Sequence, residues 1–166
     1  MRKVVKGVLI VLTLVVIGIQ FVRPERTNPP VDPARTLQAN AQVPADVSAI
    51  LTRACADCHS HETRWPWYSN IAPASWLVAD DVQEGRTHMN ISDWPAPERN
   101  GKRPEAVDKL EAICDEVQSG GMPIRAYLWL HPGAKLSEAD VRTVCSWTES
   151  ERTRLKGQAS SGNSTR

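Results

Sequence analysis

Two cysteines and a histidine stand close together in the segment Cys55-Ala56-Asp57-Cys58-His59. The two thiols are three positions apart, so on one turn of helix both can add to the two vinyl groups of a single haem. The adjacent His59 would then project toward the iron as an axial ligand. This spacing predicts one covalently attached haem c per chain, with Cys55 and Cys58 as attachment sites and His59 as an iron ligand.

The same cysteine pair fits two other kinds of site. Together with Cys114 and Cys145 it would form a four-cysteine zinc site, and by itself it would be a redox-active dithiol. Zinc sites usually repeat the paired spacing, whereas Cys114 and Cys145 are solitary in the sequence. A thioredoxin-like dithiol needs a βαβ setting, and the chain shows almost no strand pattern. The histidine directly after Cys58 therefore favours haem.

A haem iron bound by His59 needs a second ligand or keeps an open site. Met122 is the strongest candidate because it lies in the segment Gly120-Gly121-Met122-Pro123. The two glycines let the backbone turn close to a ring, and the proline sets the direction in which the methionine is presented. A helix C-cap followed by a buried methionine would give the same pattern. The other candidate ligands are His61, His88, Met89 and His131.

Apolar residues at three- and four-residue steps predict the helices that position these ligands. The first helix ends at the motif, has Asp46 as a candidate N-cap, and turns inward Val47, Ile50, Leu51, Ala54 and Cys58. A short helix covers residues 75–82 and stops at Gly85. A third begins near Pro104, an allowed first-turn position, and buries Val107, Leu110, Ile113, Cys114 and Val117.

The last predicted helix begins at Ser137, where Asp140 three residues on completes a capping-box variant. Its inward positions are Val141, Val144, Cys145 and Trp147. Cys114 and Cys145 therefore both lie on inward helical faces, where they form either a disulfide or two buried free thiols. A disulfide would add about 3–4 kcal/mol of stability in the chain-entropy description.

The N-terminus carries an uncharged, mostly aliphatic run over residues 7–22, preceded by Arg2, Lys3 and Lys6. The run is slightly shorter than a bilayer core of about 30 Å, and no small-residue cleavage site follows it closely. We therefore expect residues 1–26 to be an uncleaved transmembrane helix. Basic residues at the start predict a single-pass protein of the cytoplasmic (inner) membrane, with the haem domain facing the periplasm, a compartment that favours the disulfide.

The rest of the chain divides into a Pro-rich tether over 27–44, a haem-binding domain over 45–150 and a polar basic tail over 151–166. The formal net charge of +1 excludes a nucleic-acid binder that relies on charge. Residues 27–150 nevertheless carry 11 basic and 17 acidic side chains, which favours a partner with a basic docking surface. Six tryptophans among nine aromatic residues would supply apolar wall around a haem.

Several further blocks accompany the motif: Glu62-Thr63, Trp65-Pro66-Trp67-Tyr68-Ser69, Ile71-Ala72-Pro73, Ser75-Trp76-Leu77, Glu84-Gly85-Arg86, Gly121-Met122-Pro123, Tyr127, His131-Pro132 and Leu136-Ser137. With them, residues 45–149 resemble the bacterial haem-binding-domain family of small membrane-anchored c-type cytochromes. The resemblance implies an all-α, cytochrome-c-like fold around a single covalent haem. It also implies Cys55 and Cys58 as thioether sites, His59 as proximal ligand, and Met122 at the family's Met-Pro position.

Taken together, the sequence predicts a monohaem c-type cytochrome that carries single electrons and is not an enzyme. Iron held by His59 and Met122 would cycle between ferrous and ferric states with both ligands bound. The alternatives are a peroxidase-like haem enzyme, which needs an open iron site, and a gas-binding haem sensor, in which Met122 leaves the iron.

Overall fold

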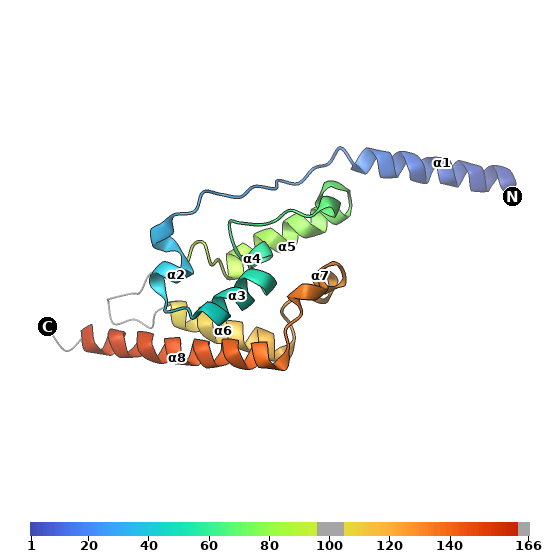
Figure 1. Cartoon of the computed structure of the whole chain (residues 1–166). Coiled ribbons are helices and arrows are strands. Elements are labelled where there is room, and N and C mark those ends of the chain that lie inside the picture. Colours follow the sequence, from blue (N-terminus) through green and yellow to red (C-terminus); the bar gives the residue numbers. More distant parts are fainter. Residues whose placement is uncertain (96–104, 163–166) are drawn as a thin grey trace.

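The computed structural model describes residues 1–95 and 105–162 (Figure 1). These residues form helices and short 3-10 turns and contain no strand, in agreement with the predicted all-α class. The elements in chain order are α1 (Arg2–Ile19), η1 (Pro33–Arg35), α2 (Leu37–Asn40), α3 (Ala45–Ala54), α4 (Ala56–His59), η2 (Trp67–Asn70), α5 (Ala74–His88), α6 (Glu105–Ser119), α7 (Arg125–Leu130), η3 (Pro132–Ala134) and α8 (Glu138–Gly162).

Helices α6 and α8 form the base of the core, lying side by side in opposite directions with α3 packed above them (Figure 1). The inward face predicted for α6 is confirmed, because its apolar positions belong to the main core cluster. The start predicted near Pro104 lies outside the described residues. The core cluster comprises Leu37, Val47, Ile50, Leu51, Met89, Ile91, Trp94, Ala106, Val107, Leu110, Ile113, Val117, Val144, Trp147 and Leu155.

The start of α8 follows the predicted capping box. The hydroxyl of Ser137 accepts from the backbone nitrogen of Asp140 at 3.1 Å, and the Asp140 carboxylate accepts from the backbone nitrogen of Ser137 at 2.8 Å. The helix then continues to Gly162, although the sequence suggested a polar tail from residue 151. Leu155 is the reason, because it lies on the same face as Val144 and is buried in the core.

Two other helices differ from their predicted extents. The helix before the motif stops at Ala54, its N-cap is Pro44 rather than Asp46, and a separate turn, α4, begins after Cys55. Helix α5 does not stop at Gly85 but runs on to His88. Glycine is compatible with a helix interior when close packing offsets its cost, and Gly85 is buried against a neighbouring segment.

The predicted transmembrane helix is wrong. In the part of the chain that the structure describes, no helix is both long and apolar enough to cross a membrane. Helix α1 begins at Arg2 and ends at Ile19, so its uncharged portion is only about 20 Å long, against about 30 Å of bilayer core. The single-pass inner-membrane location and the membrane partner were both predicted from that segment. The same finding therefore overturns them.

The residues after α1 attach to the domain. The side chain of Gln20 makes two hydrogen bonds to the backbone of Ala72, at 2.9 and 3.1 Å. The indole of Trp76 donates to the carbonyl of Val22 at 2.7 Å. Helix α1 itself buries no residue and extends away from the other helices (Figure 1).

The segment predicted as an extended tether, residues 27–44, is also packed against the domain. Leu37 is fully buried, and its backbone nitrogen donates to the carbonyl of Ile91 at 2.8 Å. The backbone nitrogen of Trp94 donates to the carbonyl of Arg35 at 2.7 Å. These contacts help to hold a proline-rich segment that composition alone suggested was free.

Candidate functional site

The cysteine–histidine motif lies in the short turn α4, immediately after the amphipathic helix α3. The chain breaks helical geometry at Cys55, whose φ and ψ are −124° and −35°, and the next four residues form α4. Helix α3 is fixed in the core by its buried face, so it determines where α4 begins. Cys55 and Cys58 are half-buried and carry free thiols.

His59 is held in one defined orientation. Its Nδ1 lies 2.8 Å from the carbonyl oxygen of Gly85 and 3.0 Å from that of Met89. Both neighbours are acceptors, so Nδ1 carries the proton and the lone pair is on Nε2. Among the described residues nothing bonds to Nε2. A second-shell hydrogen bond of this kind is typical of metal-ligating histidines.

The protonation of His59 agrees with this arrangement. Burial lowers the pKa of the imidazole, although the hydrogen bonds to the Met89 and Gly85 carbonyls oppose that shift. The neutral form is therefore favoured at neutral pH, and it is the form that binds a metal ion through Nε2.

Gly85 brings helix α5 into direct contact with the motif. A Cβ built on this residue would lie 2.8 Å from the carbonyl oxygen of Cys58, a distance that real Cβ atoms essentially never show. Only glycine therefore lets α5 approach closely enough for its carbonyl to reach His59. The helical pattern of the sequence predicted that Gly85 ends the helix and gave no sign of this role, since the contact links positions 26 residues apart.

The two thiols are poorly suited to dithiol redox chemistry. Burial, followed by the effect of Cys58, raises the pKa of Cys55 to about 12. Burial, followed by the carboxylates of Asp81 and Asp57, raises the pKa of Cys58 to about 11. Redox-active cysteine pairs depend on a lowered thiol pKa, so these values count against the dithiol alternative.

The other two cysteines are not available to a metal. Cys114 on α6 and Cys145 on α8 are joined by a disulfide, with their Cα atoms 4.9 Å apart. The four-cysteine zinc alternative therefore fails. Within residues 1–95 and 105–162, no group of three or more His, Cys, Asp or Glu side chains is arranged to hold a metal ion.

Asp57, inside the motif, connects three separate segments. Its carboxylate forms an ion pair with Arg64 at 3.0 Å and accepts from the hydroxyl of Tyr127 at 2.7 Å. Burial alone would raise the pKa of Asp57, but the hydrogen bonds from Arg64 and Tyr127 lower it below its usual value. No sequence pattern predicted this role of Asp57, because Tyr127 is 70 positions away.

A buried donor without a partner follows Arg64 in the sequence. The indole nitrogen of Trp65 is buried and makes no hydrogen bond among the described residues. Trp65 follows Arg64, which holds Asp57. An unsatisfied buried donor is costly, and a carboxylate such as a haem propionate would supply its acceptor. The free thiols, the bare Nε2 of His59 and this indole together fit a haem.

Four of the six tryptophans take two different positions. Trp94 and Trp147 are buried in the core cluster. Trp67 on η2 and Trp129 on α7 are 73% and 83% exposed. Large exposed rings of this kind are available to cover an apolar ligand.

Met122 follows the end of α6, where Gly120 has a φ of +73° and reverses the chain. Met122 is half-buried, and its backbone nitrogen donates to the carbonyl of Glu116 at 3.2 Å. Helix α7 begins three residues later, and Tyr127 on it reaches Asp57 in the motif. The structure thus links the Met122 segment to the attachment segment.

The other candidate ligands lie in different surroundings. The Nε2 of His61 lies 2.8 Å from the amide nitrogen of Asn90, and His88 is exposed beside Glu84. Met89 is in the core, and its carbonyl faces Nδ1 of His59, on the side of the ring away from Nε2. His131 stacks on Tyr127, with ring centroids 4.1 Å apart.

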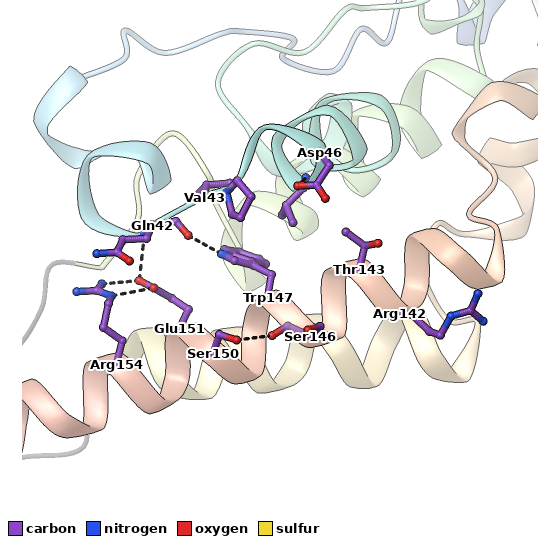
Figure 2. A pocket seen from close by; sticks show the side chains of 12 residues that line it. Gln42, Val43, Asp46, Arg142, Thr143, Ser146, Trp147, Ser150, Glu151 and Arg154 are labelled. Carbon is purple, nitrogen blue, oxygen red and sulfur yellow. Dashed lines mark hydrogen bonds and ion pairs between the residues drawn. The ribbon is translucent and has the colours of Figure 1, made fainter.

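A groove of about 960 Å³ lies on another part of the molecule, between residues 42–47 and α8 (Figure 2). Its buried Glu151 is paired with Arg154 and accepts from the backbone nitrogen of Gln42, and the Trp147 indole donates to the Gln42 carbonyl (Figure 2). None of its lining residues belongs to the motif. Its buried polar groups already have partners, so we place the functional site at α4.

Comparison with known protein families gives a match to the haem-binding domain over residues 14–150, which is most of the chain. No curated protein and no solved structure matches it. The family match agrees with the free thiols and the oriented histidine of α4. The chain belongs to the haem-binding domain family and is a haem protein.

Proposed function

We propose that this haem protein is a monohaem c-type cytochrome that carries single electrons. Cys55 and Cys58 hold the haem through thioether bonds, and Nε2 of His59 and the sulfur of Met122 are the axial ligands. Each bond forms when the sulfur adds to one vinyl carbon and the thiol proton goes to the other, so no oxidant or reductant is consumed. The bound haem supplies reversible one-electron oxidation and reduction.

The observation that carries this proposal is the environment of His59. Two backbone carbonyls fix the ring through Nδ1, so Nε2 needs no reorganisation to act as a ligand. The thiols of Cys55 and Cys58 lie on the same turn, within four residues of this ring. A haem held at that turn is therefore bound by three groups that the fold already orients.

Met122 is the proposed second iron ligand because its segment is connected to the motif. Gly120 reverses the chain after α6, and Tyr127 ties the following helix to Asp57. Asn90 engages His61, and Met89 is buried in the core. Methionine as second ligand favours the ferrous state relative to a second histidine.

We further propose a redox partner with a basic docking surface. Helix α5 places Asp80, Asp81 and Glu84 on the element packed against the motif, and the carboxylate of Asp81 acts electrostatically on Cys58. The rings of Trp67 on η2 and Trp129 on α7 are also exposed. Exposed carboxylates and aromatic rings suit a weak, salt-sensitive encounter.

The first test is an optical spectrum of the full chain co-expressed with haem-attachment machinery. We expect haem that survives extraction with acidified acetone, a low-spin ferrous spectrum and the weak ferric sulfur-to-iron band. The double variant Cys55→Ala/Cys58→Ala should lose covalent haem. The matched control, Cys114→Ala/Cys145→Ala, should retain it. Haem that is extracted from the wild-type chain would contradict covalent attachment.

The second test concerns Met122. Met122→Ala should abolish the sulfur-to-iron band and lower the reduction potential, because the iron loses its thioether ligand. Met89→Leu is the matched control and should keep the band. A high-spin ferric spectrum in the wild-type chain would remove Met122 as ligand and favour the peroxidase-like or gas-binding alternative.

The docking proposal is tested by salt dependence. The second-order rate of electron exchange with a basic redox protein should fall as ionic strength rises from about 10 to about 200 mM, because exposed charges become screened. Exchange with an acidic redox protein should be slower and should rise with salt. A rate independent of salt for both would contradict an acidic docking face.

A further inference from the structure

Helix α7 is held to the domain by unusually few contacts. None of its residues is buried, and Trp129 and Leu130 on it are largely exposed. Of the elements that the structure describes, only the adjoining turn η3 packs against α7. The segment from Gly121 to η3 therefore depends on individual side-chain contacts to keep its place.

Tyr127 makes the contact that reaches the motif. Its hydroxyl donates to Oδ2 of Asp57 at 2.7 Å. The other carboxylate oxygen, Oδ1, accepts from the guanidinium of Arg64 at 3.0 Å. Arg64 also donates to Oδ2, at 3.3 Å, so the carboxylate that accepts from Tyr127 is fixed through both oxygens. The side chain of Asp57 is only 13% exposed.

The ring of Tyr127 is fixed as well. It stacks on His131 with an interplanar angle of 12° and a centroid distance of 4.1 Å. The Nδ1 of His131 lies 3.2 Å from the carbonyl oxygen of Tyr127, which makes Nδ1 a donor. Beyond His131, Arg53 on α3 donates to the carbonyls of Gly133 and Lys135. The far end of the segment is therefore anchored, and Tyr127 anchors its middle.

We propose that Tyr127 is a positioning residue that holds the Met122 segment against the haem-attachment motif through its hydrogen bond to Asp57. The role of Met122 in this inference rests on the proposed function, whereas the contact between α7 and α4 does not. Without the hydroxyl, residues 121–131 open more often, and the iron loses the methionine sulfur more readily to a competing ligand.

The test compares Tyr127→Phe with the wild-type chain, both loaded with haem. A hydrogen bond to a charged, mostly buried carboxylate supports an expectation of about a tenfold higher affinity of the ferric iron for added imidazole. Amide exchange over residues 121–131 should accelerate by a similar factor, while exchange over α6 stays unchanged. A general loss of stability would accelerate both segments.

Tyr68→Phe is the matched control. The Tyr68 ring also contacts His131, with centroids 6.1 Å apart, but among the described residues its hydroxyl makes no hydrogen bond to Asp57. This variant should leave imidazole affinity and amide exchange at wild-type values. In an Asp57→Ala background, Tyr127→Phe should have little further effect, because the acceptor is already gone.

The outcomes separate this inference from the proposed function. If Tyr127→Phe behaves like the wild type in both measurements, or has its full effect in the Asp57→Ala background, the positioning role is overturned. If the wild-type chain lacks the sulfur-to-iron band but Tyr127→Phe still accelerates exchange over residues 121–131, Met122 ligation fails and the positioning role of Tyr127 stands.

Discussion

The carbonyl oxygen of Gly85 accepts from Nδ1 of His59 at 2.8 Å, and the same glycine has no room for a side chain beside Cys58. The two facts are connected, because the carbonyl reaches the imidazole only when α5 lies directly against α4. A helix–turn contact that depends on a missing Cβ therefore sets the orientation of the proposed iron ligand.

Gly85→Ala should disturb this contact. The added Cβ would lie 2.8 Å from the Cys58 carbonyl, so backbone must shift, at a cost of about 1–3 kcal/mol in unfolding free energy. The shift should also change the orientation of His59, which is visible in the electron paramagnetic resonance spectrum of the ferric protein.

The matched control is Gly157→Ala. Gly157 lies in α8, and a Cβ there would meet nothing within 4 Å. Alanine is the better helix former, so this variant should gain about 0.5–1 kcal/mol and leave the ferric spectrum unchanged. Equal effects of the two substitutions would contradict the contact with Cys58.

The disulfide between Cys114 and Cys145 should stabilise the fold without affecting haem attachment. It joins α6 to α8 and closes a loop of 31 residues, so Cys114→Ala/Cys145→Ala should cost about 3–4 kcal/mol by urea unfolding. Adding reductant should lower the stability of the wild-type chain and leave the double variant unaffected. An equal loss in both would show that reductant acts elsewhere.

Even the conservative substitution Arg86→Lys should lower the stability of the fold. Its guanidinium donates to the carbonyls of Ser60 and Thr27 and to the side chains of Asn28 and Thr63. Lysine cannot reproduce this fork, so Arg86→Lys should cost about 2–3 kcal/mol. It should also speed amide exchange over residues 20–30.

Arg142→Lys controls for the chemical change itself. Arg142 is 71% exposed and, among the residues that the structure describes, pairs with Glu138 one turn away, so its substitution should cost less than about 0.5 kcal/mol. If Arg86→Lys were as mild as this control, its four hydrogen bonds would contribute nothing net to stability.

The cap of α8 should depend on pH through Asp140. Hydrogen bonds from the backbone and hydroxyl of Ser137 lower the pKa of this carboxyl below its usual value. The unfolded chain then binds the proton more readily than the folded chain. The stabilisation is therefore complete above the unfolded pKa of about 3.9 and is lost as pH falls through the lowered folded pKa.

Asp140→Ala should cost about 1 kcal/mol at neutral pH, and its difference from wild type should shrink between about pH 5 and pH 2. Urea unfolding at several pH values measures this difference. Glu138→Ala, in the same helical turn and 96% exposed, should cost less than about 0.5 kcal/mol at any pH. A difference for Asp140→Ala that persists unchanged at pH 2 would contradict the cap.

Features that depend on neighbouring residues could be predicted from the sequence. The inward faces of α3 and α6 follow from apolar periodicity, and the start of α8 follows from Ser137 and Asp140 three positions apart. The proximity of Cys55, Cys58 and His59 needs only one turn of chain. In each case the interacting groups are a few residues apart, so local geometry brings them together.

The prediction of a free tether failed for the opposite reason. Composition suggested that residues 27–44 were free, yet the backbone of Leu37 bonds to Ile91 and that of Arg35 to Trp94. These partners are more than fifty positions away in sequence. Hydropathy over a short window does not contain them.

The sequence by itself determined that a thiol pair and a histidine share one turn, and which helices would bury their apolar faces. The tertiary structure decided which carbonyls hold His59, that Cys114 and Cys145 are joined, and that Tyr127 reaches Asp57. The physical reason is separation along the chain. The orientation of the His59 ring, the Cys114–Cys145 disulfide and the hydrogen bond between Tyr127 and Asp57 each depend on groups that only packing brings within about 3 Å of one another.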